Sequence, residues 1–403
     1  MRVSSLSLTL FLLLPVAVAA QASRVHTVVG EFSADIHSKK GMGCETCHTG
    51  VTQADVQNPA AASKFVIKRE RIPQLCGSCH ADVNRIKQLD PQVNPKLRVD
   101  QLELYRTSAH GIKFAHGDTR VAVCTDCHST HTIRPASDPL SSVHPMNVAK
   151  TCERCHADAD YMKAYHVATD QFAGYTASVH HEAMVAAGDL SAPTCTTCHS
   201  SHGAAPAGLN AAADVCITCH VQQAKFFEES PHKEAFALLA APSCITCHTS
   251  HLIKHPDDGF VGTGAHAVCS DCHSKTDPAG KAADGIHERF QRLESEIASA
   301  KAVIDRAQLA GMDVEAAQLQ LAQATGALAK ARVTVHTARL ARVDAEVAEG
   351  TKIAAAASAG GEAALKERDR RRRSVILPLF AIAALMVSLG AYLREIEKTE
   401  VAV

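Results

Sequence analysis

The sequence predicts a mainly α-helical protein with much irregular loop, followed by a helical hairpin and a C-terminal transmembrane helix. Three observations lead to this fold class. Short Cys-x-x-Cys-His motifs recur from Cys44 to His273. Two later stretches repeat apolar residues at alternating spacings of three and four, which is a helical pattern. Finally, the apolar run at 374–393 has about the 20 residues that a membrane-spanning helix needs.

Every cysteine belongs to one of the motifs. The chain has 16 cysteines, which form eight C-x-x-C pairs, and a histidine follows each pair directly. This is the attachment sequence of c-type haem, in which the two thiols form thioethers with the porphyrin and the histidine binds the iron from the proximal side. The predicted haem-bearing cysteines are Cys44, Cys47, Cys76, Cys79, Cys124, Cys127, Cys152, Cys155, Cys195, Cys198, Cys216, Cys219, Cys244, Cys247, Cys269 and Cys272. The predicted proximal ligands are His48, His80, His128, His156, His199, His220, His248 and His273.

Zinc sites and a disulfide framework are the alternative uses of so many cysteines. Neither requires a histidine directly after each second cysteine, whereas all eight pairs have one. The chain also has no tryptophan and 4% aromatic residues, so the large side chains that usually dominate a core are scarce. We therefore predict eight covalently bound haems c, stacked as the core of a multihaem cytochrome c domain at residues 23–278. Nothing in the near-neutral charge indicates nucleic-acid binding.

The first 22 residues read as a secretory signal peptide. Arg2 precedes an apolar run from Leu6 to Val18, and small residues suited to cleavage follow. Thioether attachment of haem takes place outside the cytoplasmic membrane, so the signal and the haem motifs support each other. We expect the haem domain in the periplasm.

An irregular internal repeat organises the motifs. Three of them extend to H-x-x-H, and an S-x-H tripeptide precedes each of these three. The plain motifs alternate with the extended ones, so the chain forms four pairs of motifs, which begin at Cys44/Cys76, Cys124/Cys152, Cys195/Cys216 and Cys244/Cys269.

The additional histidines are candidates for the distal ligand on the other side of each iron. A histidine three residues beyond the proximal one points away from its own haem and can reach a neighbouring iron. There are nine candidates for eight irons, so at least one of them is not a ligand. His181, next to His180, is an alternative to it as a distal ligand. The candidates are His37, His110, His131, His144, His180, His202, His232, His251 and His266. The histidines that lack the pattern are His26, His116, His166, His255, His287 and His336.

Methionine is the alternative distal ligand and raises the reduction potential. The methionines within the haem region show no regular placement; they are Met42, Met146, Met162 and Met184. Mostly bis-histidine haems of low potential are therefore expected.

The stretch "CHSTHTIRPASDPLSSVHPMNVAKTCERCHADA", followed by "SVH…CTTCHSSH" and "SPHKEAF…CITCHTSH", resembles membrane-anchored multihaem c-type cytochromes of the cytochrome c3-like kind. The resemblance covers roughly Gly43 to the C-terminus. It implies electron transfer in anaerobic or metal-linked respiration. The expected donor is a membrane quinol-oxidising complex, and the expected acceptor is another cytochrome or an outer-membrane protein.

The S-x-H…CxxCHxxH pattern is also similar to that of tetrahaem and octahaem cytochromes of nitrogen metabolism, which include enzymes of the nitrite and hydroxylamine type. An enzyme would need one iron with an open position. This sequence has no CxxCK motif, and we assign no catalytic residue. An assembly subunit of a respiratory complex is a third hypothesis.

Residues 279–361 have the heptad pattern of a helical hairpin. The first arm carries apolar residues from Ile286 to Ala307 and the second from Val314 to Ala338. Gly311 is the expected C-cap signal and Asp313 the expected N-cap. The hairpin serves either as a docking stalk or as a bundle that packs on itself and on the haem domain. The Gly-Gly pair at 360–361 predicts a hinge.

A basic segment at 362–373 precedes the predicted transmembrane helix at 374–393, and a short tail follows at 394–403. A buried core helix is the alternative for the apolar run. Five arginines precede the run and only Arg394 and Lys398 follow it, so the positive-inside rule would place the haem side in the cytoplasm. Long exported domains translocate largely regardless of such charges. We therefore predict a single-pass inner-membrane protein with periplasmic haems, whose arginines meet lipid phosphates or an acidic partner.

Overall fold

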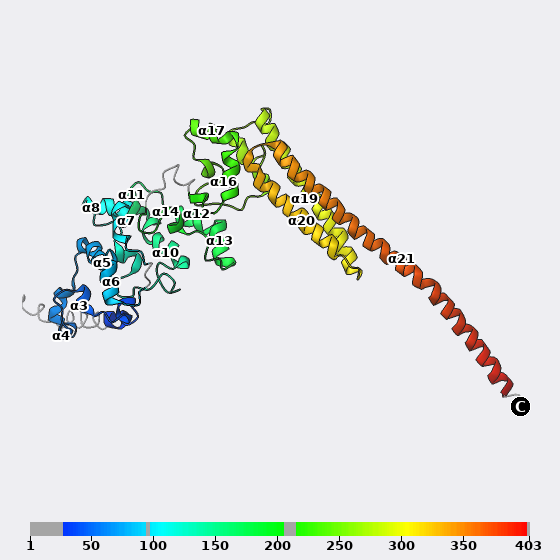
Figure 1. The fold of residues 1–403 in the computed structure, drawn as a ribbon, viewed down its shortest axis with the longest axis horizontal. Helices are drawn as coiled ribbons and strands as arrows, with labels where there is room; N and C mark the ends of the chain where they lie inside the picture. The colour runs from blue at the N-terminus through cyan, green and yellow to red at the C-terminus, as the bar shows by residue number, and fades with distance from the viewer. Residues whose placement is uncertain (1–26, 94–96, 205–214, 401–403) are drawn as a thin grey trace, which may run out of the picture. The chain divides into compact units, whose positions relative to one another are not determined.

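The computed structural model describes residues 27–93, 97–204 and 215–400 (Figure 1). The predicted signal peptide lies outside these ranges. All regular elements within them are helices, so the mainly α fold class is confirmed. The chain divides into two compact units. The first contains the residues up to Val215 together with Cys244–His255, and the second contains Cys216–Ser243 together with the residues from Pro256 onward.

The first unit consists of short helices joined by irregular loops. Their bounds are α2 Ile36–Lys39, α3 Cys44–Cys47, α4 Gln53–Val56, η1 Pro59–Phe65, η2 Arg69–Arg71, α5 Ile72–His80, α6 Val83–Leu89, α7 Gln101–Thr107, α8 Ala109–Ala115, α9 Cys124–His128, α10 Pro145–His156, α11 Ala159–Lys163, α12 Gln171–Thr176, α13 Val179–Ala186, α14 Cys195–His199 and α18 Ser243–His248. Helices of this length are not stable alone in water. Their stability must come from what they pack against.

The polypeptide of the first unit buries few large apolar side chains. Met184 and Val123 are its largest fully buried residues, whereas both clusters of buried hydrophobic residues in the described chain belong to the second unit. Several of its other buried side chains are polar and cap helices, such as Asp35, Ser108 and Ser178. This composition is expected of a unit whose interior is completed by a cofactor.

The second unit joins haem-motif segments to a bundle of three long helices. The segments contain α16 Val221–Glu228, α17 Pro231–Leu238, η3 Asp258–Phe260 and η4 Val268–Asp271. The bundle contains α19 Pro278–Leu309, α20 Glu315–Thr334, η5 Val335–Thr337 and α21 Leu340–Glu400. The predicted domain boundary at residue 278 stays a prediction, and this unit contains residues from both sides of it.

The two predicted hairpin arms are α19 and α20, and the structure adds α21 as a third arm packed against both (Figure 1). Gly311 has a left-handed φ of +75°, as expected just after a helix C-terminus. Asp313 lies one residue before the observed N-cap, Val314, and its carboxylate accepts a hydrogen bond from the Glu315 amide at 3.1 Å. The predicted N-cap is therefore displaced by one position.

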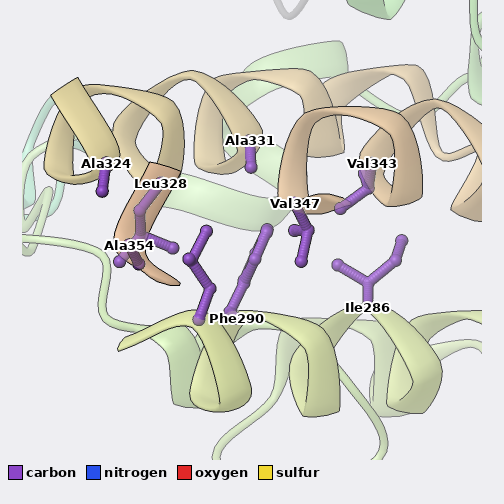
Figure 2. Close-up of a cluster of buried hydrophobic side chains, with 9 residues drawn as sticks. Ile286, Phe290, Ala324, Leu328, Ala331, Val343, Val347 and Ala354 are labelled. Atoms are coloured by element: carbon purple, nitrogen blue, oxygen red, sulfur yellow. The ribbon is translucent and has the colours of Figure 1, made fainter. Parts of the chain in front are cut away.

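All three helices contribute to the core of the bundle. Figure 2 shows Ile286 and Phe290 of α19 opposite Leu328 of α20 and Val343 and Val347 of α21, each at most 6% exposed. A second cluster continues along the bundle and includes Ala300, Ile304, Ala307, Val314, Ala317 and Ala357, with Ala364 and Leu365 packed against it. The bundle core therefore extends to about Leu365.

The predicted hinge at Gly360-Gly361 is wrong, because α21 continues through both residues. A Cβ atom at Gly361 would lie 3.0 Å from Cγ1 of Val303 and 3.1 Å from Cγ1 of Ile304. A Cβ at Gly360 would lie 3.1 Å from Cβ of Ala317. The two glycines thus let α21 approach α19 and α20 closely.

Beyond the bundle, α21 is a candidate membrane span. Its most apolar window has a mean hydropathy of 2.3 and is 0% buried, so the alternative of a buried core helix does not fit. The basic residues that precede the apolar run are partly paired within the helix, since Arg370 and Arg371 contact Glu367 at 2.5 and 2.8 Å. A long, unpacked apolar helix flanked by charges suggests a transmembrane segment.

We expect Gly361→Leu to lower the free energy of unfolding of the bundle by about 1–3 kcal/mol, because the added side chain overpacks the contact with Val303 and Ile304. The matched control is Gly326→Leu, since nothing lies within 4 Å of a Cβ built there; it should raise stability by about 0.5–1 kcal/mol through helix propensity. Far-UV circular dichroism during denaturation in detergent measures both. Equal effects at the two positions would contradict a packing role for Gly361.

Candidate haem-binding sites

Most of the Cys-x-x-Cys-His motifs lie on a helical turn. The motif occupies all of α9 and α14, forms the last turn of α5, α10 and α18, and begins α3. Cysteines three residues apart share one helix face, so both thiols can reach the edge of one porphyrin. All 16 cysteines fall within the described residues.

Six proximal histidines face a second histidine across a narrow gap. The partner is a predicted distal candidate in every case, and the ring centres lie 5.9–6.2 Å apart. The pairs are His48 with His131, His80 with His37, His128 with His202, His156 with His110, His199 with His251, and His273 with His232.

This spacing fits one metal ion between two imidazoles. A metal–nitrogen bond of about 2 Å on each side, plus about 1.1 Å from each nitrogen to its ring centre, separates the ring centres by about 6.2 Å. The described residues contain no group of three or more His, Cys, Asp or Glu side chains arranged around a single metal ion. The ligands therefore come as opposed pairs beside two thiols, which matches haem c and not a four-ligand zinc site.

The pairing follows the repeat. Each H-x-x-H histidine faces the proximal histidine of the preceding repeat, as His202 faces His128. Each S-x-H histidine whose pair is described faces the plain motif of its own repeat, as His110 faces His156. Successive repeats are therefore linked to one another through their ligands.

The S-x-H tripeptides are helix N-caps. Ser108 and Ser178 start α8 and α13, and each accepts a hydrogen bond from the backbone amide three residues ahead. Ser230 starts α17 in the same register. These three serines are at most 6% exposed. The cap fixes where the helix starts, and the histidine two residues later is therefore held on its first turn.

The second histidine of each H-x-x-H sequence lies outside the motif helix, because that helix ends at the first, proximal histidine. The next residue has a left-handed φ in all three cases, at Ser129 (+64°), Ser200 (+67°) and Thr249 (+60°). The hydroxyl of Thr249 donates to the Leu252 carbonyl at 2.8 Å and closes the new turn. If the helix continued, the second histidine would stay on the face of the first.

Asp35 is a candidate positioning residue that the sequence patterns missed. It is 0% exposed, caps α2, and accepts hydrogen bonds from the backbone amides of His37 (2.8 Å) and Ile133 (2.6 Å). Its carboxylate also lies 2.9 Å from Nδ1 of His37. A carboxylate on Nδ1 orients the ring and leaves Nε2 for a metal. Asp35-Ile36-His37 matches the S-x-H spacing, so widening that pattern to Asp would have found it.

Burial favours the neutral form of nine of the paired histidines. It is the largest cause that lowers the pKa of proximal and distal members alike, and in several pairs the facing ring adds to the effect; the affected residues are His48, His80, His110, His128, His131, His156, His202, His232 and His251. A neutral imidazole is the form that binds a metal.

Neighbouring motifs of different repeats meet through their first cysteines. Cys76 lies beside Cys124, and Cys152 lies beside Cys195. The second motif of one repeat therefore lies beside the first motif of the next.

The two motifs within a repeat approach through their second cysteines. Burial, then Asp35 and then Cys79 raise the pKa of the Cys47 thiol. For Cys127, burial is again the largest cause, and Cys155 contributes more weakly. The second and third motifs lie side by side because α5 packs on α9, and the fourth and fifth do so because α10 packs on α14.

The remaining distal candidates have different surroundings. His144 is 7% exposed and caps α10, where its Nδ1 accepts a hydrogen bond from the Met146 amide at 3.3 Å. His266 is exposed on the loop between η3 and η4. His180 has the helix position of His110, two residues after its capping serine, whereas the ring of His181 packs edge-on against Tyr175 at 5.3 Å. The structure therefore favours His180 over its competitor.

Two family models match parts of the chain. "Cytochrome c7 and related cytochrome c" matches residues 30–95, and "Doubled CXXCH motif" matches residues 183–225. The chain is a multihaem c-type cytochrome. The two matches cover the first and third motif pairs of the cytochrome. No curated protein and no solved structure gave a match.

In this cytochrome we expect Asp35→Asn to raise the reduction potential of one haem without loss of haem attachment. The substitution removes a buried negative charge beside His37, and that charge stabilises the oxidised, more positive iron. Spectroelectrochemical titration measures the shift. The matched control is Asp82→Asn, because Asp82 caps α6 through the amides of Asn84 and Arg85 and has no such histidine contact. Equal titrations for both variants and the unaltered protein would contradict a role for Asp35.

Proposed function

We propose that the cytochrome is an octahaem electron carrier anchored in the inner membrane, with its haem domain in the periplasm. It transfers electrons between a quinol-linked membrane donor and a periplasmic or outer-membrane acceptor in respiration. Bound haem c supplies a reversible one-electron couple at each iron. The polypeptide spaces the irons and sets their potentials through ligands, burial and hydrogen bonds.

The observation that carries this proposal is the facing of proximal and distal histidines. At six motifs a second imidazole stands where the other axial position of an iron would be. An iron with two histidine ligands has no open position for a substrate. At these six irons, transfer of electrons rather than conversion of a bound molecule is the chemistry that remains.

The order of the motifs supports a conducting array. Motifs that follow one another in the chain lie near each other, because α5 packs on α9 and α10 packs on α14. An electron that enters at one of these four motifs therefore has a neighbouring site.

The membrane anchor and the compartment are argued from α21 and from the chemistry of attachment. An exposed apolar helix of the required length follows the bundle. Haem c is attached outside the cytoplasmic membrane, as the expected signal peptide also implies. Arg372 and Arg373, directly before the span, are exposed and suited to contact lipid phosphates or an acidic partner protein.

We expect the intact mass of the mature protein to exceed that of its polypeptide by eight haems, because each of the eight cysteine pairs is a complete attachment motif. Mass spectrometry under denaturing conditions keeps thioether-bound haem and measures this directly. A titration with a thiol reagent should detect no free cysteine. A smaller haem count or bound zinc would contradict the proposal.

We further expect the oxidised protein to show only low-spin haem in electron paramagnetic resonance, with negligible turnover of nitrite or hydroxylamine. Paired imidazoles leave no coordination site for either molecule. A reference enzyme assayed in the same detergent controls for assay conditions. A high-spin signal equivalent to one haem, shifted by nitrite and accompanied by turnover, would support the enzyme hypothesis instead.

A further inference from the structure

Asp126 occupies one of the two variable positions of the third attachment motif, between Cys124 and Cys127. It is the third residue of α9, and its carboxylate accepts a hydrogen bond from the Val123 amide at 2.7 Å, which closes the first turn of that helix. The carboxylate is therefore fixed beside the two thiols that would attach the haem. Its side chain is 37% exposed, so water screens its charge only partly.

Arg69 binds this carboxylate from the segment of another motif. It lies in η2, directly before α5, which is the helix that ends with the second motif. Its Nη1 and Nη2 donate to the two carboxylate oxygens of Asp126 at 3.1 and 2.5 Å, so the ion pair is bidentate. Its Nε and Nη2 also donate to the carbonyl oxygens of Thr119 and Val121 at 2.7 and 2.8 Å. All three guanidinium nitrogens are therefore bound, which holds the positive charge on the carboxylate.

The fourth motif also contacts Asp126. Arg154 occupies a variable position of that motif, between Cys152 and Cys155, and its Nη2 donates to the backbone carbonyl oxygen of Asp126. The second motif is close as well, because α5 packs on α9. Residues from the segments of three successive motifs therefore meet at Asp126.

The charge of Asp126 acts on groups that would bind haem. Burial is the largest cause that raises the pKa of the Cys127 thiol, and Asp126 is the next. For His110, burial and then His156 lower the pKa, whereas Asp126 raises it. A negative charge at this place favours oxidised iron, which is the more positive state, and so lowers the reduction potential. A guanidinium bound to the carboxylate has the opposite effect.

We propose that Arg69 is a positioning residue that fixes and neutralises the Asp126 carboxylate, and that this ion pair sets the reduction potential of the haem at Cys124 and Cys127. The inference rests on the proposed function, because it requires haem at this motif and electron transfer through it. The haem belongs to the third motif, between the second and the fourth in the chain. Its potential therefore decides whether an electron stays there or passes to a neighbouring haem.

The test compares substitutions of both partners in the full-length, haem-loaded protein. Asp126→Asn removes the negative charge but keeps an oxygen for the Val123 amide, so it should raise the potential of one haem in eight. Arg69→Gln removes the positive charge and should lower the potential of the same haem. The double variant removes both charges and should return that potential toward its value in the unaltered protein. Redox titration followed by paramagnetic resonance measures each shift. A merely structural role would not give shifts of opposite sign.

Arg69→Lys keeps the positive charge and should therefore restore most of the potential that is lost in Arg69→Gln. The matched controls are Arg134→Gln and Asp138→Asn, because this ion pair, at 2.8 Å and also partly exposed, joins two residues of one loop. Both controls should leave this potential unchanged.

No shift in Asp126→Asn and Arg69→Gln, or shifts in the same direction, would overturn the proposal. So would a double variant that shifts as far as either single one. If Arg69→Gln accumulates poorly, Asp126→Asn and Arg69→Lys with their full haem mass still decide, since only the first should change the potential. Failure of the proposed function differs, because a haem deficit or high-spin iron would then be present in the unaltered protein.

Discussion

The haem-bearing structure depends on pairs of imidazoles that face each other, with their ring centres about 6 Å apart. The helices of the first unit are too short to be stable alone, and the polypeptide there buries few large apolar side chains. An iron between two histidines would join segments far apart in the chain, such as those of His48 and His131. Each H-x-x-H histidine reaches back by one repeat, so every such bond would hold two repeats together. The helix caps and the residues with left-handed φ hold these histidines in the positions that such a bond requires.

The sequence predicts this arrangement well where the residues involved lie close together along the chain. The attachment motif lies within five consecutive residues, and the S-x-H cap places a histidine on a first helical turn, so spacing alone identifies both. Six of the nine patterned histidines face a proximal one, although the sequence does not say which. Those partners depend on how repeats pack, and nothing in an S-x-H or H-x-x-H pattern specifies the iron that it serves.

The features that the sequence did not predict depend on tertiary contacts. Asp35 occupies the position that serine has in the S-x-H pattern, and its contact with His37 shows that aspartate can stand there. The glycines at 360–361 resemble a hinge in the sequence, but the proximity of Val303 and Ile304 gives them a packing role. Local propensity cannot separate these two uses of glycine.

The continuity of α21 sets a distance between the redox centres and the lipid. The helix starts beside η5 at Leu340 and reaches the apolar span near Ser374. At about 1.5 Å per residue, this stretch measures roughly 50 Å along its axis. Under the proposed function, a quinol dissolved in the bilayer would therefore be too remote to reduce a haem near η5 by direct encounter. The donor would need a redox group that projects well above the membrane surface, so the length of this helix would limit which proteins can reduce that haem.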